Sequence, residues 1–134
     1  MELTEEEIKV IVEAAKKGLT GDDVQIYEEI YKDTSGAVTT RIKDFTKCPI
    51  GKIRVITHIA ALDATSSPTY IKLCHQNGGE LAIDKVGVAP PTGETVNWDG
   101  FFIIGELDYA EVIWLGITSG DDLYAVISGY EITR

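Results

Sequence analysis

Along most of the chain, hydrophobic and polar residues alternate with the period of two that is typical of β-strands. From residue 50 onward, short runs of this kind recur about every ten residues, each bounded by Gly, Pro, Asn or Asp. We interpret as strands the runs 53–61, 70–75, 80–86, 95–98, 101–104, 110–117 and 123–132. Asn77-Gly78-Gly79 and Asp99-Gly100 are predicted to form the turns of two hairpins.

The last of these runs changes phase near its end. Leu123 and Ile127 share one face, whereas Tyr130 and Ile132 fall on the other. One extra residue at Ser128-Gly129 accounts for the shift, so we expect a β-bulge at this point.

The N-terminal segment follows a helical period instead. Thr4 and Glu7 have the spacing of a capping box, and Gly18 is a suitable C-cap, so we expect a helix over about 5–17. We assign residues 1–20 to this helix and residues 21–134 to a β-sandwich domain. The apolar stripe of the helix needs a cover, either its own sandwich or a neighbouring subunit. Its members, our candidate interaction residues on the helix, are Ile8, Ile11, Val12 and Ala15.

Residues 21–31 fit either a helical face or an interrupted strand. We favour a strand because Asp33-Thr34-Ser35-Gly36 forms a turn signal and the β-branched run 38–42 follows it. Together these segments predict another hairpin. With eight or so strands and no helix between them, the chain is predicted to be mainly β, a two-sheet sandwich with one N-terminal amphipathic helix. A jelly roll is the favoured arrangement, while other Greek-key connections give the same sequence pattern.

Charge narrows the classes of partner. The chain has 134 residues, which fits one domain, and a net charge of −10. Through Lys85 there are 14 acids and 11 Lys or Arg, whereas from Val86 onward eight acids are opposed by Arg134 alone. Nucleic acids and anionic membranes, which require clustered basic residues, are therefore not expected as partners. The acidity serves either solubility or a basic docking partner, and Asp121 and Asp122 are our candidate residues for such docking.

Few residues suggest a catalytic or metal-binding site. His58 and His75 lie within strand patterns without metal-ligand spacing, and Cys48 and Cys74 lie outside any CxxC motif. The common catalytic motifs do not occur, so we expect no enzymatic activity, no metal and no cofactor. Acidic loops could supply calcium ligands, but they do not have the spacing of a known calcium loop. A glycosidase-like carboxylate pair from the same loops depends on a distance in space that the sequence does not give. Trp114 is predicted to lie in the core, and Trp98, beside the Asp99-Gly100 turn, to be a surface aromatic.

Residues 70–132 also present a recurring order of elements. The stretch Tyr70-Ile71-Lys72-Leu73 is followed by a Gly turn and Leu81-Ala82-Ile83, and Val96-Asn97-Trp98-Asp99-Gly100 leads into Phe101-Phe102-Ile103-Ile104. The last two stretches are Ser119-Gly120-Asp121-Asp122-Leu123 and Ser128-Gly129-Tyr130-Glu131-Ile132. In this order, residues 50–134 resemble small β-sandwich proteins of tailed-phage virions, described as decoration, head-fibre or minor structural proteins.

The resemblance has defined limits. Gly105-Glu106-Leu107-Asp108 departs from the Gly-Asp turn that such chains often carry, and residues 1–49 are not covered. The resemblance implies a structural role in a virion and brings no functional residue with it. Our leading hypothesis is therefore a non-enzymatic phage protein, a capsid decoration or minor capsid protein, made in the host cytoplasm. Its expected partners are capsid or other virion proteins and further copies of itself, as a homo-oligomer.

Two hypotheses from other classes remain open. A carbohydrate-binding β-sandwich for adhesion is the alternative, because Trp98 and several Tyr residues could stack on sugars. A hydrolase using loop carboxylates is the third, and its acid and base would have to come together through long-range contacts.

Overall fold

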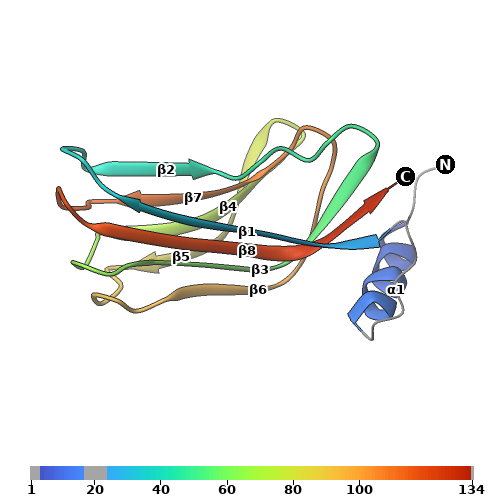
Figure 1. Ribbon diagram of the computed structural model, residues 1–134, viewed down its shortest axis with the longest axis horizontal. Coiled ribbons are helices and arrows are strands. Elements are labelled where there is room, and N and C mark those ends of the chain that lie inside the picture. Colours follow the sequence, from blue (N-terminus) through green and yellow to red (C-terminus); the bar gives the residue numbers. More distant parts are fainter. Residues whose placement is uncertain (1–3, 17–23, 134) are drawn as a thin grey trace.

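The computed structural model describes residues 4–16 and 24–133, and for residues 11–16 it describes the backbone alone. In these ranges the chain forms one helix, α1 (Glu5–Lys16), and eight strands arranged in two antiparallel sheets (Figure 1). The strands are β1 (Val24–Thr34), β2 (Thr40–Asp44), β3 (Lys52–Asp63), β4 (Tyr70–Asn77), β5 (Glu80–Val88), β6 (Val96–Ile104), β7 (Ala110–Leu115) and β8 (Asp122–Thr133). Sheet A has the strand order β1-β8-β3-β6, and sheet B has the order β2-β7-β4-β5.

The connections are those of a jelly roll. The chain passes from one sheet to the other at almost every loop, and among the described strands β4 and β5 are the only consecutive pair within one sheet. Two four-stranded sheets linked in this way form the double Greek key that defines the jelly roll. The predicted mainly β sandwich, its jelly-roll arrangement and the hairpin at Asn77-Gly78-Gly79 are confirmed.

The segment after α1 corrects one expectation and confirms another. Residues 24–31 do form a strand, as favoured from the sequence, but β1 and β2 form no hairpin, because β1 pairs with β8 and β2 with β7. Between them the chain crosses at buried Ser35, whose N–H donates to the carbonyl of Asp121 at 2.8 Å. The turn residues signal a change of direction, and the long-range contact decides which strand becomes the neighbour.

The prediction of a hairpin at Asp99-Gly100 is also wrong, since β6 runs through this dipeptide without a turn. Asp99 pairs with His58 of β3, where the register shifts. A Cβ on Gly100 would lie 2.6 Å from the indole ring of Trp98. The glycine therefore makes room for a side chain within the strand.

The expected bulge exists, but on the opposite strand. β3 places Ile56 opposite Gly129 and His58 opposite Ser128, which leaves Thr57 as the extra residue. Ser128-Gly129 itself pairs regularly with β1. A Cβ on Gly129 would lie 1.9 Å from the carbonyl oxygen of Val55, so glycine is required for the close approach of β3 and β8.

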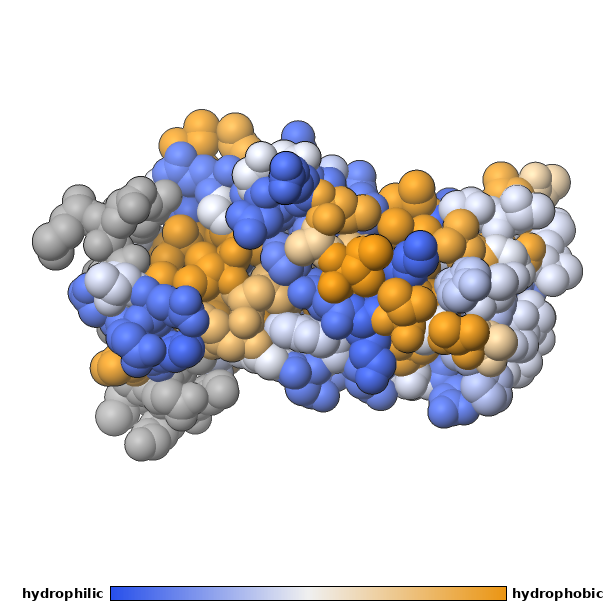
Figure 2. Space-filling view, turned by 180° about the vertical axis from the view of Figure 1, so that it is seen from behind, coloured by the Kyte–Doolittle hydropathy of each residue, from blue (hydrophilic) through white to orange (hydrophobic). Residues whose placement is uncertain are grey.

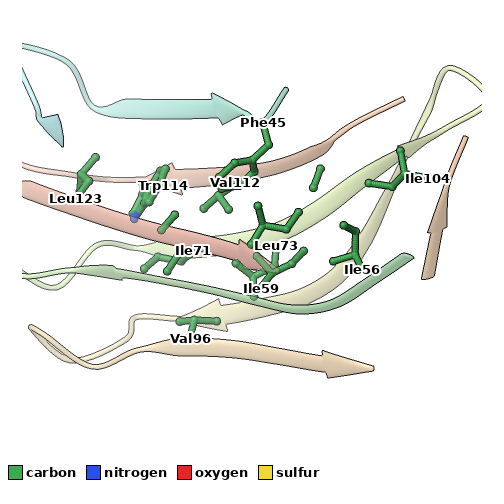
Figure 3. Close-up of a cluster of buried hydrophobic side chains, with 14 of the residues drawn as sticks. Phe45, Ile56, Ile59, Ile71, Leu73, Val96, Ile104, Val112, Trp114 and Leu123 are labelled. Carbon is green, nitrogen blue, oxygen red and sulfur yellow. The ribbon is translucent and has the colours of Figure 1, made fainter. Parts of the chain in front are cut away.

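The main core fills the space between the two sheets (Figure 3). Trp114 is fully buried there, as predicted, and its indole N–H donates to the carbonyl oxygen of Leu62 at 3.2 Å. Ile56 and Ile59 of β3 face Leu73 of β4 across this core. Because a strand that slips by one residue turns its buried side chains outward, these contacts between the two sheets fix the strand register.

The helix covers one end of the outer face of sheet A. Its predicted capping box is present: the Glu7 N–H donates to Thr4 Oγ1 at 3.2 Å, and the Thr4 N–H donates to Glu7 Oε1 at 3.3 Å. Ile8 is 3% exposed and packs on Ile53, Val55 and Ile132. Gly18 and the expected domain boundary at residue 20 lie outside the described residues. No helix in the described ranges is long and apolar enough to cross a membrane.

Candidate interaction surface

The outer face of sheet B carries an exposed, largely apolar surface. Antiparallel registers align its outward side chains in three rows across the four strands. We call these side chains the apolar face; its rows are Val88-Tyr70-Leu115-Thr40, Val86-Lys72-Ile113-Ile42 and Ile83-Cys74-Glu111-Asp44. In the third row Cys74 and Glu111 are themselves buried by their neighbours, at 0% and 8% exposed. Figure 2 views the molecule from behind, where this face lies, and shows apolar residues gathered in patches along it.

The extent of exposure separates this face from an ordinary sheet surface. Val88 is 69% exposed, and Ile42 and Ile83 are each 54% exposed. Strands with one side towards water normally place polar residues on that side. In β7, the inward Val112 and Trp114 alternate with outward Ile113 and Leu115, so that both faces of the strand are apolar. Exposed apolar surfaces are typical of sites that contact other macromolecules, which makes this face the candidate interaction surface.

Two oppositely charged features lie within the apolar face. Lys72 stands in the middle row, with its ammonium 5.9 Å from the ring centroid of Tyr70. In the next row, Asp44 and Glu111 lie directly opposite each other on β2 and β7. Burial, followed by the hydrogen bond and repulsion from Asp44, raises the pKa of Glu111 to about 7. Burial and the nearby Glu111 raise the pKa of Cys74 in the same row to about 11.

The outer face of sheet A is different because α1 occupies part of it. Beyond the helix, Ile26 and Ile30 of the edge strand β1 are 79% and 74% exposed. Next to Ile30 lies a hollow of about 290 Å³ whose floor includes Ala60 and whose wall includes Tyr124. Ile30 is in register with Val126 of β8, which also lines this hollow. Ile8 of α1 packs on the other end of the face, so part of sheet A is already covered within the chain.

Of the candidate residues on the helix, the structure places one. Ile8 is buried against its own sandwich, so this part of the stripe has an intramolecular cover. The side chains of Ile11, Val12 and Ala15 lie outside the described residues. Whether the helix also meets a neighbouring subunit stays a prediction.

Asp121 is not available to a partner. Its side chain is 1% exposed, and its Oδ2 accepts hydrogen bonds from Ser66 Oγ at 2.6 Å and from the Thr118 N–H at 2.9 Å. The expectation that it faces solvent or a basic partner is therefore wrong, because the loop between β7 and β8 folds inward over it. Asp122 remains half-buried and accepts a hydrogen bond from Thr34 Oγ1 at 2.7 Å.

Trp98 was expected as a surface aromatic, and the structure exposes it only in part. Its ring is half-buried, covers Gly100 and tilts against Phe102 with 4.9 Å between ring centroids. The cause is the straight course of β6, which directs Trp98 between the sheets instead of placing it beside a turn.

Both histidines have carboxylate partners that sequence spacing did not reveal. His58 Nδ1 lies 2.8 Å from Asp99 Oδ1, and His75 Nδ1 lies 2.8 Å from Asp84 Oδ2. The His75 ring also stacks on Phe102 at 4.0 Å and lines a cleft of about 560 Å³ at the end of the sandwich. In the described part of the chain, no three His, Cys, Asp or Glu side chains are grouped to hold a metal ion.

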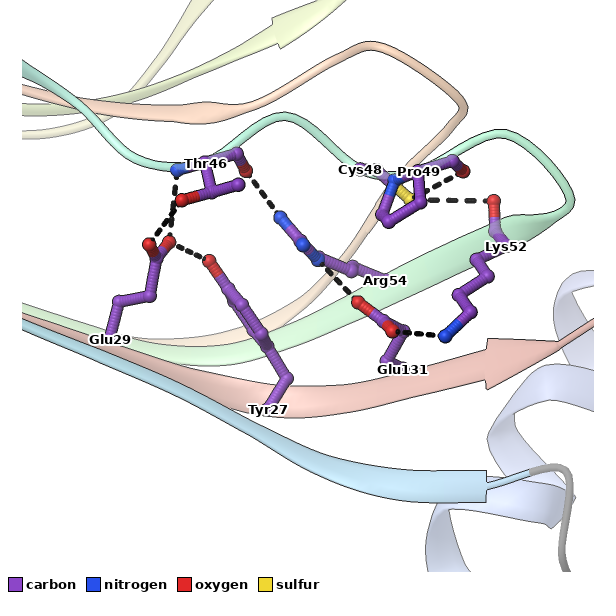
Figure 4. A network of polar contacts seen from close by, with 8 residues as sticks. All are labelled: Tyr27, Glu29, Thr46, Cys48, Pro49, Lys52, Arg54 and Glu131. Carbon is purple, nitrogen blue, oxygen red and sulfur yellow. Dashed lines mark hydrogen bonds and ion pairs between the residues drawn. The ribbon is translucent and has the colours of Figure 1, made fainter.

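A polar network closes the gap between β1 and the segment joining β2 to β3 (Figure 4). Arg54 lies with its guanidinium carbon 4.1 Å from the ring centroid of Tyr27 and donates to Glu131 at 2.9 Å and to the Thr46 carbonyl. Although burial opposes it, the hydrogen bonds from Arg54 and Lys52 lower the pKa of Glu131. These charges serve the sandwich itself. With Glu111 and Asp121, Glu131 is one of three acids after Lys85 whose charge is largely withdrawn from the surface.

Known proteins resemble this chain in structure and not in sequence. No protein-family model and no curated protein matches the chain. Among solved structures it is similar to a Bacillus endospore appendage pilus protein, with 14% identity, a TM-score of 0.45 and coverage of 83% of this chain and 88% of that one. A chain of infectious bursal disease virus strain Gx is 9% identical at a TM-score of 0.40, and the match covers 84% of this chain and 34% of the viral chain.

A carbohydrate-binding module of the CBM4 type is a further similar structure. It is 11% identical at a TM-score of 0.30, and the match covers 78% of this chain and 82% of that one. Pilus, viral and carbohydrate-binding proteins are thus among the structures to which this β-sandwich is similar, and the likeness assigns no function to it.

Proposed function

We propose that this protein is a non-enzymatic structural subunit that binds other protein subunits through the apolar face of sheet B. The observation that carries the proposal is the set of three aligned rows, in which strongly exposed aliphatic side chains on β2 and β5 flank those of β7. Each exposed Val or Ile gains ~1.5–3 kcal/mol when it is fully removed from water, so covering this face favours association.

The assembly that we propose is a phage virion, in which the chain acts as a capsid decoration or minor capsid protein. Support comes from the order of elements in residues 50–134, which resembles that of small virion proteins, and from the jelly-roll connections. The net charge of −10 also suits a protein that contacts capsid subunits and not the nucleic acid.

Co-sedimentation tests this proposal. Particles from a lysed culture that expresses the gene are banded in a density gradient, and mass spectrometry measures this chain in the particle band. We expect the natural chain in the band and the Val88→Asp variant at the top of the gradient. Ile26→Asp, at an even more exposed position on sheet A, is the matched control and should stay with the particles.

Two outcomes contradict the proposal in different ways. If the natural chain does not enter the particle band, the virion role is wrong. If both variants stay with the particles, or both leave them, the apolar face has no specific part in binding.

The end cleft favours carbohydrate binding as a second candidate function. It combines aromatic rings, Phe101 and Phe102, with polar groups from Asn77 and Asp108, which is the composition that sugar sites require. A glycan array tests this candidate directly. It predicts a bound sugar whose signal is lost in Asn77→Ala, and an array without any signal contradicts it.

A further inference from the structure

The charges of the apolar face have no counter-charges within the described part of the chain. Lys72 forms no ion pair there, and its ammonium lies near the Tyr70 ring. Asp44 and Glu111 likewise have each other as neighbours and no cation in ion-pair distance. Ionising a carboxyl group that is only 8% exposed is costly until a cation reaches it.

The two features lie in neighbouring rows and on neighbouring strands. Lys72 on β4 is opposite Ile113 on β7. The next outward-facing pair on these two strands is Cys74 and Glu111, in the neighbouring row. The face thus carries one cation and one acidic pair at a fixed, short separation. A surface with this arrangement is complementary to a copy of itself that has been turned over.

From this arrangement we infer that a second copy of the chain covers the apolar face, with Lys72 of each copy contacting Asp44 and Glu111 of the other. The inference rests on the proposed function of this face and specifies its occupant. The two sheets would face each other about 10 Å apart, the usual separation of packed sheets, and form a symmetric dimer.

A two-fold axis running across the strands, between the Lys72 row and the Glu111 row, produces these contacts. It places Lys72 of one copy over Cys74 of the other, one strand spacing of about 4.8 Å from Glu111. The four methylene groups of lysine span this distance, and the symmetry repeats the contact with the roles of the copies exchanged. Aliphatic side chains from the flanking rows then pack around the two charged contacts.

The size of the face sets the expected affinity. Four strands about 4.8 Å apart and three rows about 6.8 Å apart make a patch of roughly 19 by 20 Å. Covering it on both copies buries on the order of 1,000 Å², which is the lower limit for a specific interface. We therefore expect a dissociation constant in the micromolar range, on the order of 1–50 μM.

Sedimentation velocity of the purified full chain, from about 1 to 200 μM, tests the inference. We expect a monomer–dimer equilibrium that Lys72→Glu and Glu111→Lys each weaken by about tenfold or more, because like charges then face each other. An equimolar mixture of the two variants should recover dimers within about threefold of the natural affinity, since both charged contacts are restored in reversed or natural form. Should Glu111→Lys fail to fold by circular dichroism, Asp44→Lys at the exposed neighbour replaces it.

Lys32→Glu is the matched control, because Lys32 also sits on a strand near a tyrosine ring, 5.4 Å from that of Tyr124, but on sheet A. It should leave the dimer unchanged. A natural chain that stays monomeric, a mixture that does not recover, or an equal effect of Lys32→Glu overturns the inference. If the chain is monomeric while Val88→Asp still leaves the particle band, a different protein covers the face, and the proposed function stands without the dimer.

Discussion

Asp63, at the end of β3, and Asp121, in the loop before β8, bring their carboxyl groups together at a buried end of the sandwich. Asp63 Oδ1 accepts hydrogen bonds from the N–H groups of Thr65 and Ser66 at 3.0 and 3.1 Å. Its Oδ2 has no donor, the one such buried side-chain atom among the described residues. A proton on Oδ2, shared with Asp121, satisfies this atom and joins the loop after β3 to the loop before β8.

This pair predicts that stability falls as pH rises. Burial, and then the hydrogen bond with Asp121, raises the pKa of Asp63. The folded state therefore holds a proton that the unfolded state has released, and the resulting stability is complete below about pH 4 and lost above the raised pKa. Asp63→Asn, whose amide donates permanently, should be more stable than the natural chain at pH 8 by ~1 kcal/mol or more. Urea unfolding at pH 5 and pH 8 checks this, and an Asn variant that is less stable at pH 8 contradicts it.

Glu111 predicts a second pH effect with the same sign. Its pKa is raised to about 7, first by burial and then by Asp44. Cys74 on β4 and Tyr109, which directly precedes β7, also lie near it. Stability from this group is complete below pH ~4.5 and declines as pH rises through about 7. Glu111→Gln should remove ~1–3 kcal/mol of the difference in unfolding free energy between pH 5 and pH 8. The measurement is made at a low, monomeric concentration, and an unchanged pH slope would show that the pKa of Glu111 is not raised.

Gly129 tests the close approach of β3 and β8. An added Cβ would lie 1.9 Å from the Val55 carbonyl oxygen, so Gly129→Ala must move a central strand. We expect a loss of ~3 kcal/mol or more in the free energy of unfolding, or failure to fold. Gly36→Ala is the control, because nothing lies within 4 Å of the Cβ that it would add. Equal stability of the two variants in urea would refute the close approach of β3 and β8 at Gly129.

Ile8 tests whether the helix belongs to the sandwich. Because Ile8 packs on Ile53, Val55 and Ile132, we expect Ile8→Ala to cost ~2–4 kcal/mol. Val10→Ala, at a position that is 69% exposed on the same helix, should change stability by less than ~0.5 kcal/mol. Thermal unfolding of both variants decides the matter. A silent Ile8→Ala would favour the alternative cover, a neighbouring subunit.

The sequence predicted the layered β architecture because strand alternation depends on local residues. The period-two runs and the Asn77-Gly78-Gly79 turn contain the information for β3, β4, β5, β7 and β8. The hairpins expected at Asp33–Gly36 and Asp99-Gly100 failed because turn residues do not identify the pairing partner. That partner is set by contacts far apart in sequence, such as Ser35 with Asp121.

The interaction surface was less predictable than the fold. Trp98 was chosen because it stood beside an expected turn and Asp121 because acids predominate after Lys85, yet long-range packing draws both inward. The apolar face was missed because it combines residues of four strands, and their order in the sheet, β2-β7-β4-β5, is not evident from the sequence. One signal was available: the run from Val112 to Leu115 is apolar at both alternating positions, which indicates a strand covered on both sides.

Hydroxyl-radical footprinting of side chains, in the assembled state and in the dilute chain, tests the central claim most directly. Tyr70 and Val88 of the apolar face should be protected on assembly, while Ile26 and Ile30 on sheet A keep their reactivity. Protection of Ile26 and Ile30 with unchanged Tyr70 and Val88 would contradict the claim that sheet B is the interaction surface.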